Sequence, residues 1–570
     1  MGENKGFVEE PPRRISALRH NPKIAYFSME IGIIPEIPSY AGGLGILAGD
    51  TIRSCADLKV PMVAITLLSD GGYFNQKIDE EGNQIETLVE FSPTSFLRLI
   101  DGEIKVSIRN KEVKVRPWCY VVKGATGFEV PIILLDTNID GNGDWERSLT
   151  RCLYGGDERY RFAQEILLGV GGYRILRGLG FTGIFRFHMN EGHAALLTLE
   201  LFNKTRNNEF VRQQCVFTTH TPVSAGHDQF DLGLVRSMLG NLLPEEIVPH
   251  VSFENKLNMT KLGLFFSRFI NGVAKSHSEI SRELFPGYSI DSITNGVHHR
   301  TWSSEPFKRL FDRHIPGWRL DASLLRAAVG IPEEEIWEAH MAAKRSLIDL
   351  VNMNSNSDMC EEAFVIGFAR RQTGYKRPDL LISDPERLMS IAKGQGPIQI
   401  VYAGKAHPRD IQGKEIIRHI ISAKKSLRDD VKIAFLENYD MELALSLVAG
   451  TDLWLNTPRF PLEASGTSGM KAALNAVPQL STLDGWWVEG HLEDITGWSI
   501  GPKRIVHTNS SDDGEDMEDM YHKLEHKILP MFYADRQKWI QIMRNCIAIN
   551  ASFFHTQRMV EQYVVHAYFL

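Results

Sequence analysis

The sequence has few cysteines, and their spacing provides no structural framework. Six cysteines are scattered singly along 570 residues and form no Cys-x-x-Cys pair. This usage excludes a disulfide scaffold or a zinc knuckle and is typical of reduced, structural thiols. We therefore expect free cysteines and a reducing compartment.

Long apolar runs are also missing. Residues 1–10 lack the apolar core of a signal peptide. No later segment reaches the ~18 consecutive apolar residues that a membrane-spanning helix requires. We therefore expect a cytoplasmic protein without a membrane segment.

An excess of positive charge is the third missing feature. The formal net charge is −8, and the basic residues form no continuous stripe. This balance argues against a nucleic-acid surface or an anionic-membrane surface. Any phosphate binding must come from a local cluster of cations.

What is present is an alternation of apolar runs with helical patterns along the whole chain, which predicts α/β architecture with parallel sheets. The length predicts two large domains. We place the boundary after the turn-rich segment 294–302, which gives domains of 1–302 and 303–550 and a terminal segment of 551–570. Strands are predicted at 24–28, 61–68, 131–136, 184–188, 216–219, 363–369, 398–403, 432–436, 452–456 and 477–482. In the first half, helices are predicted at 45–58, 159–176 and 193–203.

The stretch Glu463-Ala-Ser-Gly-Thr-Ser-Gly-Met-Lys471 places an amine after small, hydroxyl-bearing and glycine residues. Such a loop can fold closely around a phosphate, and a helix is expected to begin beside Lys471. A cationic amine next to a phosphate cradle suits a phosphorylated aldehyde cofactor. On its own the stretch is equally consistent with an ordinary glycine-rich loop entering a helix.

Further cations follow predicted strands. Arg370, Arg371 and Lys376 share a loop around Gly374, and Lys405 follows the next strand. Arginine offers a planar fork for phosphate oxygens and lysine a mobile charge. The alternative for each motif is a solvated basic turn. The acidic run 512–519 reads as a solvated loop and helix start.

Four histidines, at positions 188, 193, 220 and 227, lie near two strand ends. Their spacing is not that of a zinc hydrolase, and no thiol accompanies them, so we expect no metal. We expect His220 to reach a substrate, with His193 and Glu191 nearby; the alternative is that these histidines cap strand ends. Trp486 and Trp487 are expected to pack rather than to bind sugar.

Several of these stretches occur together in one known family and in its order. They are 26–30, 40–50, 154–157, 190–193, 218–222, 294–296, 367–377 and 463–471. The chain resembles the α-glucan (glycogen, starch and maltodextrin) phosphorylases, most closely their short bacterial and archaeal branch. The resemblance covers most of the chain.

The resemblance implies two Rossmann-like domains facing across a cleft, the GT-B arrangement, with the final helix, near 553–567, returning to the first domain. It also implies pyridoxal 5′-phosphate held as a Schiff base on Lys471, with the cofactor's phosphate facing the substrate phosphate. The implied partners are glycogen or maltodextrin and inorganic phosphate, without nucleic acid or membrane, in a homodimer or larger oligomer.

Roles transfer residue by residue. The resemblance implies that Arg371 and Lys376 bind phosphate, while Thr467, Arg370 and Tyr439 contact the cofactor. The backbone N–H groups of Gly42 and Gly43 would serve both cofactor and phosphate. At Asp440 the larger members carry a basic residue, so this cationic contact is not implied here. The transferred glucose would meet His220, Asn295, Glu463, Ser465 and Gly466.

The implied reaction is phosphorolysis with retention. Phosphate donates a proton to the glycosidic oxygen of the terminal α-1,4-linked glucose and then attacks the same face, so that α-glucose 1-phosphate leaves. No carboxylate pair is needed, unlike in glycosidases. Two alternatives stay open: a retaining synthase that uses a nucleotide-sugar donor, and an inactive glucan-binding protein on the same fold.

Overall fold

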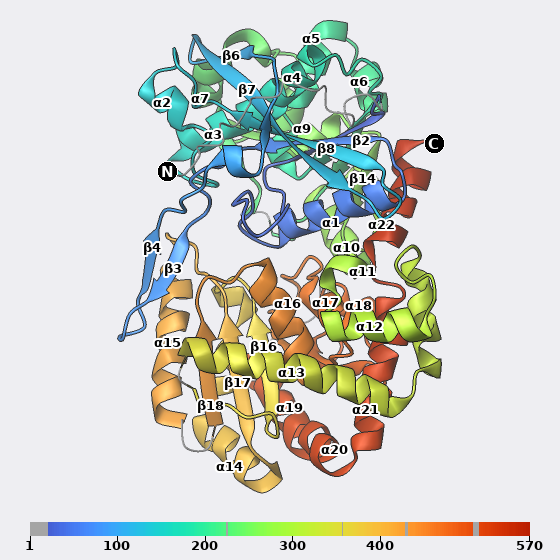
Figure 1. Cartoon of the computed structure of the whole chain (residues 1–570). Coiled ribbons are helices and arrows are strands. Elements are labelled where there is room, and N and C mark those ends of the chain that lie inside the picture. The colour runs from blue at the N-terminus through green and yellow to red at the C-terminus, as the bar shows by residue number, and fades with distance from the viewer. Residues whose placement is uncertain (1–20, 224–225, 356, 428–430, 505–511, 570) are drawn as a thin grey trace, which may run out of the picture.

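The computed structural model describes residues 21–223, 226–355, 357–427, 431–504 and 512–569. Residues 1–20, including the segment examined for a signal peptide, lie outside the described residues. The described residues form two bodies, each built around a large sheet (Figure 1). The first body holds the sheet that contains β1, and the second body holds the sheet that contains β16.

The centre of the first sheet is parallel. Its first strand, β1, lies in the middle, and the later strands are added on either side of it. Its central order is β8-β2-β1-β9-β10-β14, and β15 follows β14 at one edge. Antiparallel β7 pairs with β8 at the other edge and carries β5 and β6. The strand bounds are β1 Ile24–Ser28, β2 Met62–Leu67, β5 Arg98–Leu99, β6 Ile104–Ile108, β7 Lys111–Lys123, β8 Glu129–Asp136, β9 Arg186–Asn190, β10 Cys215–Thr218, β14 Phe269–Gly272 and β15 Asp291–Ser292.

The second sheet repeats this arrangement. Its order is β18-β17-β16-β19-β20-β21, and all its strands run parallel. If the strands of each parallel centre are numbered along the chain, both sheets have the order 3-2-1-4-5-6. This is the strand order of Rossmann-type domains. The bounds are β16 Phe364–Ala369, β17 Ile398–Ala403, β18 Val431–Leu436, β19 Leu453–Asn456, β20 Gln479–Thr482 and β21 Gly497–Ile500.

The central strands are continuously apolar because both of their faces are covered. β1, β2, β16 and β17 are buried at every position, as expected for parallel strands between helix layers. The main helices are α1 Gly43–Asp57, α3 Glu158–Ile166, α4 Gly172–Gly178, α5 Leu197–Thr205, α9 Met259–Phe265, α10 Lys275–Leu284, α12 Glu305–His314, α13 Glu333–Ser355, α14 Pro385–Gln395, α15 Ile411–Leu427, α16 Met441–Gly450, α17 Ser468–Leu474, α19 Asp513–Lys523, α20 Leu529–Ala534, α21 Arg536–Asn545 and α22 Thr556–Tyr563. Every helix among the described residues is too short or too polar to span a bilayer.

The end of the chain packs on the first body. Met559 and Val560 of α22 share a core with Ile24 and Ile52, and Figure 1 shows α22 beside α1. The imidazole of His188 hydrogen-bonds the hydroxyl of Tyr568 at 2.7 Å, so this histidine anchors the end of the chain.

A two-stranded hairpin of the first body reaches the second. β3 (Asn75–Ile78) and β4 (Gln84–Thr87) extend down to α15 in Figure 1. Two buried amides fix the contact: Gln76 Nε2 donates to the carbonyl of Gly404 at 3.0 Å, and Gln84 Nε2 donates to the carbonyl of Ala406 at 2.9 Å.

Some sequence expectations were incomplete. The helix expected over 159–176 is present as one continuous helical run, in which a π-helical turn at Leu167–Gly171 joins α3 to α4. β9 lies two residues later than predicted. The strands from β3 to β7 were not predicted, although the alternation of apolar and polar residues in β6 and at the start of β7 is a strand pattern. The acidic run does start α19, but Asp516 in it is fully buried between Arg377 and Arg504 rather than solvated.

Candidate active site

Ligands of open α/β sheets bind where the strand order reverses, outside the carboxyl ends of the strands. In the second body this point lies between β16 and β19. The loop that carries Arg370 and Arg371 follows β16, and the loop that leads to Lys471 follows β19. The topology therefore brings together the two stretches that sequence reasoning singled out separately.

Lys471 lies on the first turns of α17 and is 6% exposed. Its Nζ lies 3.5 Å from the centroid of the Trp302 ring. Burial lowers the pKa of Lys471 to about 8, although the charge of Asp50 acts in the opposite direction. A buried amine with a lowered pKa is partly neutral near pH 7, the form that attacks an aldehyde.

Two glycines constrain the segment that leads to Lys471, one in the loop before α17 and one in the first turn of α17. Gly466 has a φ of +70°, in the left-handed region. A Cβ on Gly469 would lie 1.4 Å from Oε1 of the buried Gln479, so a side chain there would displace that amide. The start of α17 consequently packs closely against the side chain of Gln479 on β20, and Gly466 lets the preceding loop turn sharply.

Two cations of the β16 loop share one carboxylate oxygen. Oε2 of Glu463 lies 2.9 Å from Nη2 of Arg370 and 2.8 Å from Nζ of Lys376. Burial acts to raise the pKa of Glu463, but the two cations outweigh it and lower that pKa to about 2. Nε and Nη1 of Arg370 are buried and have no hydrogen-bond partner among the described residues. The cluster thus retains donors for a further anion.

Arg371 connects this cluster to the first body. Burial acts to lower the pKa of Arg371, but Tyr375, Tyr73 and Glu30 outweigh it, and the pKa is raised. Glu30 and Tyr73 belong to the first body. The carboxylate charge of Glu30 therefore acts on an arginine at the switch point of the second sheet.

Glu30 also holds the glycine turn that precedes α1. Its Oε2 accepts the N–H groups of Ala41 at 2.7 Å and Gly42 at 3.0 Å, and its Oε1 accepts the hydroxyl of Tyr154 at 2.9 Å. The N–H of Gly42, one of two predicted anion donors, is thus directed at a carboxylate of the chain itself. Gly43 begins α1, and a Cβ there would meet open space.

His220 follows β10, the strand next to β9, and so lies one strand beyond the switch point between β1 and β9. Its Nε2 lies 2.6 Å from Oδ1 of Asn190, and its backbone N–H donates to Oε2 of Glu191 at 2.6 Å. Burial lowers the pKa of His220 to about 3, so the ring is neutral near pH 7. Glu191 has a φ of +75°, a strained conformation of the kind found at functional sites. His220 is therefore oriented by two residues at the end of β9.

Asn295 is placed by the end of the chain. Nη2 of Arg558, on α22, donates to the carbonyl of Asn295 at 2.9 Å. The side chain of Asn295 is 4% exposed, and its Oδ1 has no partner among the described residues. This amide oxygen is available to a ligand.

Comparison with known proteins gives a consistent result. The carbohydrate phosphorylase family model matches residues 245–496. The chain is 40% identical to the maltodextrin phosphorylase of Thermococcus litoralis, with 95% of this chain and 70% of that protein aligned. This chain belongs to the carbohydrate phosphorylase family. It is also 33% identical to the glycogen phosphorylase of Aquifex aeolicus, over 95% of this chain and 85% of that protein. An uncharacterized protein of Methanocaldococcus jannaschii, MJ1631, is 31% identical over 95% of this chain and 99% of that protein.

In this phosphorylase the Rossmann-type strand order of both sheets agrees with the expected mixed α/β fold. The two tryptophans after β20 pack, as expected: Trp486 is 2% exposed and Trp487 is 1% exposed. Among the described residues, no group of three or more histidine, cysteine or acidic side chains is arranged to hold a metal ion.

Sequence reasoning missed three residues that contact the candidate site residues. They are Asp50, Trp302 and Asp484. Asp484 accepts the backbone N–H of Glu463 at 2.8 Å; burial, together with the charge of Glu463, raises its pKa to about 8. Asp50 and Trp302 both lie in stretches that were noted for other residues, but nothing in their spacing relates them to Lys471.

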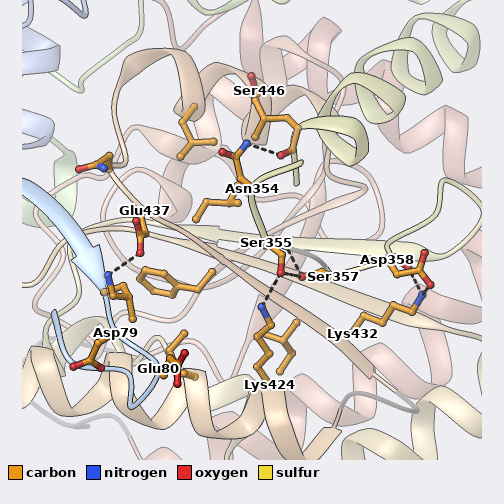
Figure 2. A pocket seen from close by; sticks show the side chains of 18 of the residues that line it. Asp79, Glu80, Asn354, Ser355, Ser357, Asp358, Lys424, Lys432, Glu437 and Ser446 are labelled. Atoms are coloured by element: carbon orange, nitrogen blue, oxygen red, sulfur yellow. Dashed lines mark hydrogen bonds and ion pairs between the residues drawn. The ribbon is translucent and has the colours of Figure 1, made fainter. Parts of the chain in front are cut away.

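A cavity of about 1570 Å³ lies elsewhere on the phosphorylase, between the tip of the β3–β4 hairpin and β18. Figure 2 shows Glu437 of the second body reaching the hairpin, where it accepts the N–H of Ile78 at 2.7 Å. No residue predicted for the active site lines this cavity.

Proposed function

We propose that this chain is an α-1,4-glucan phosphorylase. It transfers the non-reducing-end glucose of glycogen or maltodextrin to inorganic phosphate, reversibly and with retention, and releases α-glucose 1-phosphate. The observation that carries the proposal is the buried amine of Lys471, which follows a glycine-containing loop at the same strand-order reversal as Arg370, whose Nε and Nη1 have no partner among the described residues. A nucleotide-sugar enzyme has no use for this amine.

We further propose that residues 1–302 and 303–550 act as two domains that face each other across a cleft, in the GT-B arrangement, and that residues 551–570 return to the first domain. The proximity of Glu30 and Tyr73 to Arg371 supports facing switch points. The packing of α22 on the core around Ile24 supports the return.

Pyridoxal 5′-phosphate is the proposed cofactor, covalently attached to Lys471. Thr467 and the unpaired Nε and Nη1 of Arg370 would hold its phosphate, and Tyr439 and the glycine turn at Gly42 and Gly43 would line its site. When bound, the cofactor supplies a phosphate that exchanges a proton with the substrate phosphate.

The substrate phosphate would be bound by Arg371 and Lys376 from the second domain and by the N–H of Gly43 from the first. Two phosphates can lie close together in a buried site only if cations and shared protons offset their repulsion. Glu463 provides the balancing charge while the anion site is empty, because its carboxylate bridges Arg370 and Lys376.

His220, Asn295, Glu463, Ser465 and Gly466 would bind the hydroxyls of the transferred glucose. The imidazole of His220 is neutral, and its Nε2 hydrogen-bonds Asn190. We therefore expect Nδ1 of His220 to bind a sugar hydroxyl. These contacts orient the anomeric carbon above the phosphate, which then protonates the leaving oxygen and attacks from the same face.

The experiment that tests this proposal offers the purified protein two kinds of glucosyl donor: maltoheptaose together with phosphate, and nucleotide sugars. Maltoheptaose with phosphate should yield glucose 1-phosphate, and nucleotide sugars should not extend the acceptor. The purified protein should carry one pyridoxal phosphate per chain, visible in its near-ultraviolet spectrum. Elongation from a nucleotide sugar, without cofactor, would identify a synthase instead. Glucan binding without either reaction would identify an inactive binding protein.

Cytoplasmic location and a homodimer or larger assembly belong to the same proposal. The family's glucan and phosphate substrates and the six free cysteines support a reducing cytoplasm. Sedimentation of the purified chain measures the assembly.

A further inference from the structure

A carboxylate of the first body lies behind the aromatic ring that contacts Lys471. Asp50, on α1, is 1% exposed. Its Oδ2 accepts the indole N–H of Trp302 at 2.7 Å and the backbone N–H of His298 at 3.1 Å. Its Oδ1 pairs with Nη1 of Arg53 at 3.3 Å. The carboxylate is therefore compensated, and both of its oxygens are engaged.

Trp302 is held from two sides. Its indole N–H is fixed by Asp50, and its carbonyl accepts Nδ2 of Asn475 at 2.7 Å. The same Nδ2 donates to the carbonyl of Lys471 at 2.9 Å, so one buried amide joins the backbones of Trp302 and Lys471. The ring face of Trp302 then supports Nζ of Lys471, at 3.5 Å from the ring centroid.

We propose that Asp50 is a positioning residue for cofactor attachment: by fixing the indole of Trp302 it holds the amine of Lys471 in the geometry that captures the cofactor aldehyde. This inference rests on the proposed function, because it assumes that Lys471 carries the cofactor. It adds that attachment in the second domain depends on a carboxylate of the first.

The physical reason is the cost of an unpaired indole N–H. Trp302 is 1% exposed, so water cannot replace a lost acceptor. A buried donor without a partner costs about 1–3 kcal/mol, which favours rotation of the ring away from its present place. Rotation would remove the surface against which Nζ rests, and the amine of Lys471 would sample positions unsuited to attack.

The test uses three substitutions, of which the two at Asp50 separate the hydrogen bond from the charge. Asp50→Asn keeps an oxygen that can accept the indole N–H. Asp50→Leu has a similar shape and keeps none. Trp302→Phe keeps a ring but removes the N–H. Each is prepared as the full chain, stripped of cofactor, and its folded fraction is isolated by gel filtration.

The readout is the rate of covalent attachment of added pyridoxal phosphate, followed by absorbance and confirmed by borohydride reduction and mapping of Lys471. We expect Asp50→Leu and Trp302→Phe to slow attachment roughly 10- to 100-fold, and Asp50→Asn to stay within about 3-fold of the parent chain. Equal rates for Asp50→Leu and the parent would overturn the inference.

Asp136 provides a matched control. It is 2% exposed, accepts the indole N–H of Trp118 at 3.0 Å and pairs with Nε of Arg116 at 2.8 Å, away from Lys471. Asp136→Leu should lower stability to a similar degree but leave the attachment rate of the folded fraction unchanged. An equal slowing in Asp136→Leu would mean that loss of stability alone causes the effect. If the parent chain itself attached no cofactor at Lys471, the proposed function would fail rather than this inference.

Discussion

Replacing Glu463 by glutamine should make the stability of the protein depend on phosphate. In the parent chain one carboxylate oxygen pairs with both Arg370 and Lys376, at 2.9 Å and 2.8 Å. Glutamine keeps the shape but removes the charge. Two buried cations then face each other uncompensated until an anion binds between them.

The size of the effect follows from the lowered pKa of Glu463. The fall from the ordinary value of 4.5 to about 2 corresponds to about 3 kcal/mol, at 1.36 kcal/mol per pKa unit. Breaking a buried ion pair costs a similar ~3–5 kcal/mol. Because the folded-state pKa is lowered, this contribution is present above pH 4.5 and is lost as the pH falls from 4.5 towards 2. Glu463→Gln should lose it at every pH.

The assay is thermal unfolding of the cofactor-free chain at pH 7 with increasing phosphate. Glu463→Gln should unfold at a lower temperature than the parent and should recover more of the difference as phosphate is added, because ligand binding to the folded state stabilises it. Glu200→Gln is the matched control: Glu200 is 7% exposed and pairs with Arg174 away from the site. It should be destabilised without any added response to phosphate. An unchanged unfolding temperature for Glu463→Gln, or an equal phosphate response in both variants, would refute the reasoning.

The other predictions concern single residues of the site. Lys471→Ala should fold but lose covalent cofactor and nearly all activity; borohydride labelling of a different lysine in the parent chain would disprove the assignment. In the cofactor-free parent, attachment should accelerate as the pH rises through about 8, since only the neutral amine of Lys471 reacts, and a flat profile from pH 6 to 9 would count against the lowered pKa. Arg371→Ala should raise the KM for phosphate and lower kcat, as steady-state kinetics would show, whereas a change confined to glucan affinity would mean that the loop is misplaced. His220→Ala should slow both directions about 10- to 150-fold with an unchanged cofactor spectrum, and wild-type turnover would indicate a purely structural histidine.

The parallel centres of both sheets could be predicted from the sequence because their strands are buried on both faces. β1 and β17 lie at the predicted residues, since an apolar run between turn residues has only one consistent reading. The hairpin of β3 and β4 could not be predicted. Its buried Gln76 and Gln84 act through amide contacts with the second body, and local periodicity contains no information about such distant partners.

The residues of the candidate site likewise fall into two groups: those that the sequence reveals and those that only the fold reveals. The loop of Lys471 and the cations at Arg371 and Lys376 stand out because glycine and charge cluster locally. Trp302 and Asp50 do not, because their relation to Lys471 exists only after residues far apart in the chain have packed together. Motifs therefore revealed the charges that we propose bind ligands, and the fold revealed the side chains that contact Lys471.

The central claim is tested most directly by following the phosphorus-31 spectrum of one reaction. The cofactor-loaded chain is mixed with maltoheptaose and phosphate, and a second sample is first stripped of cofactor. The loaded sample should form α-glucose 1-phosphate, the stripped sample should form none, and added pyridoxal phosphate should restore the signal in proportion to the Lys471 modified. Formation of the β anomer, or equal turnover in the stripped sample, would contradict the account.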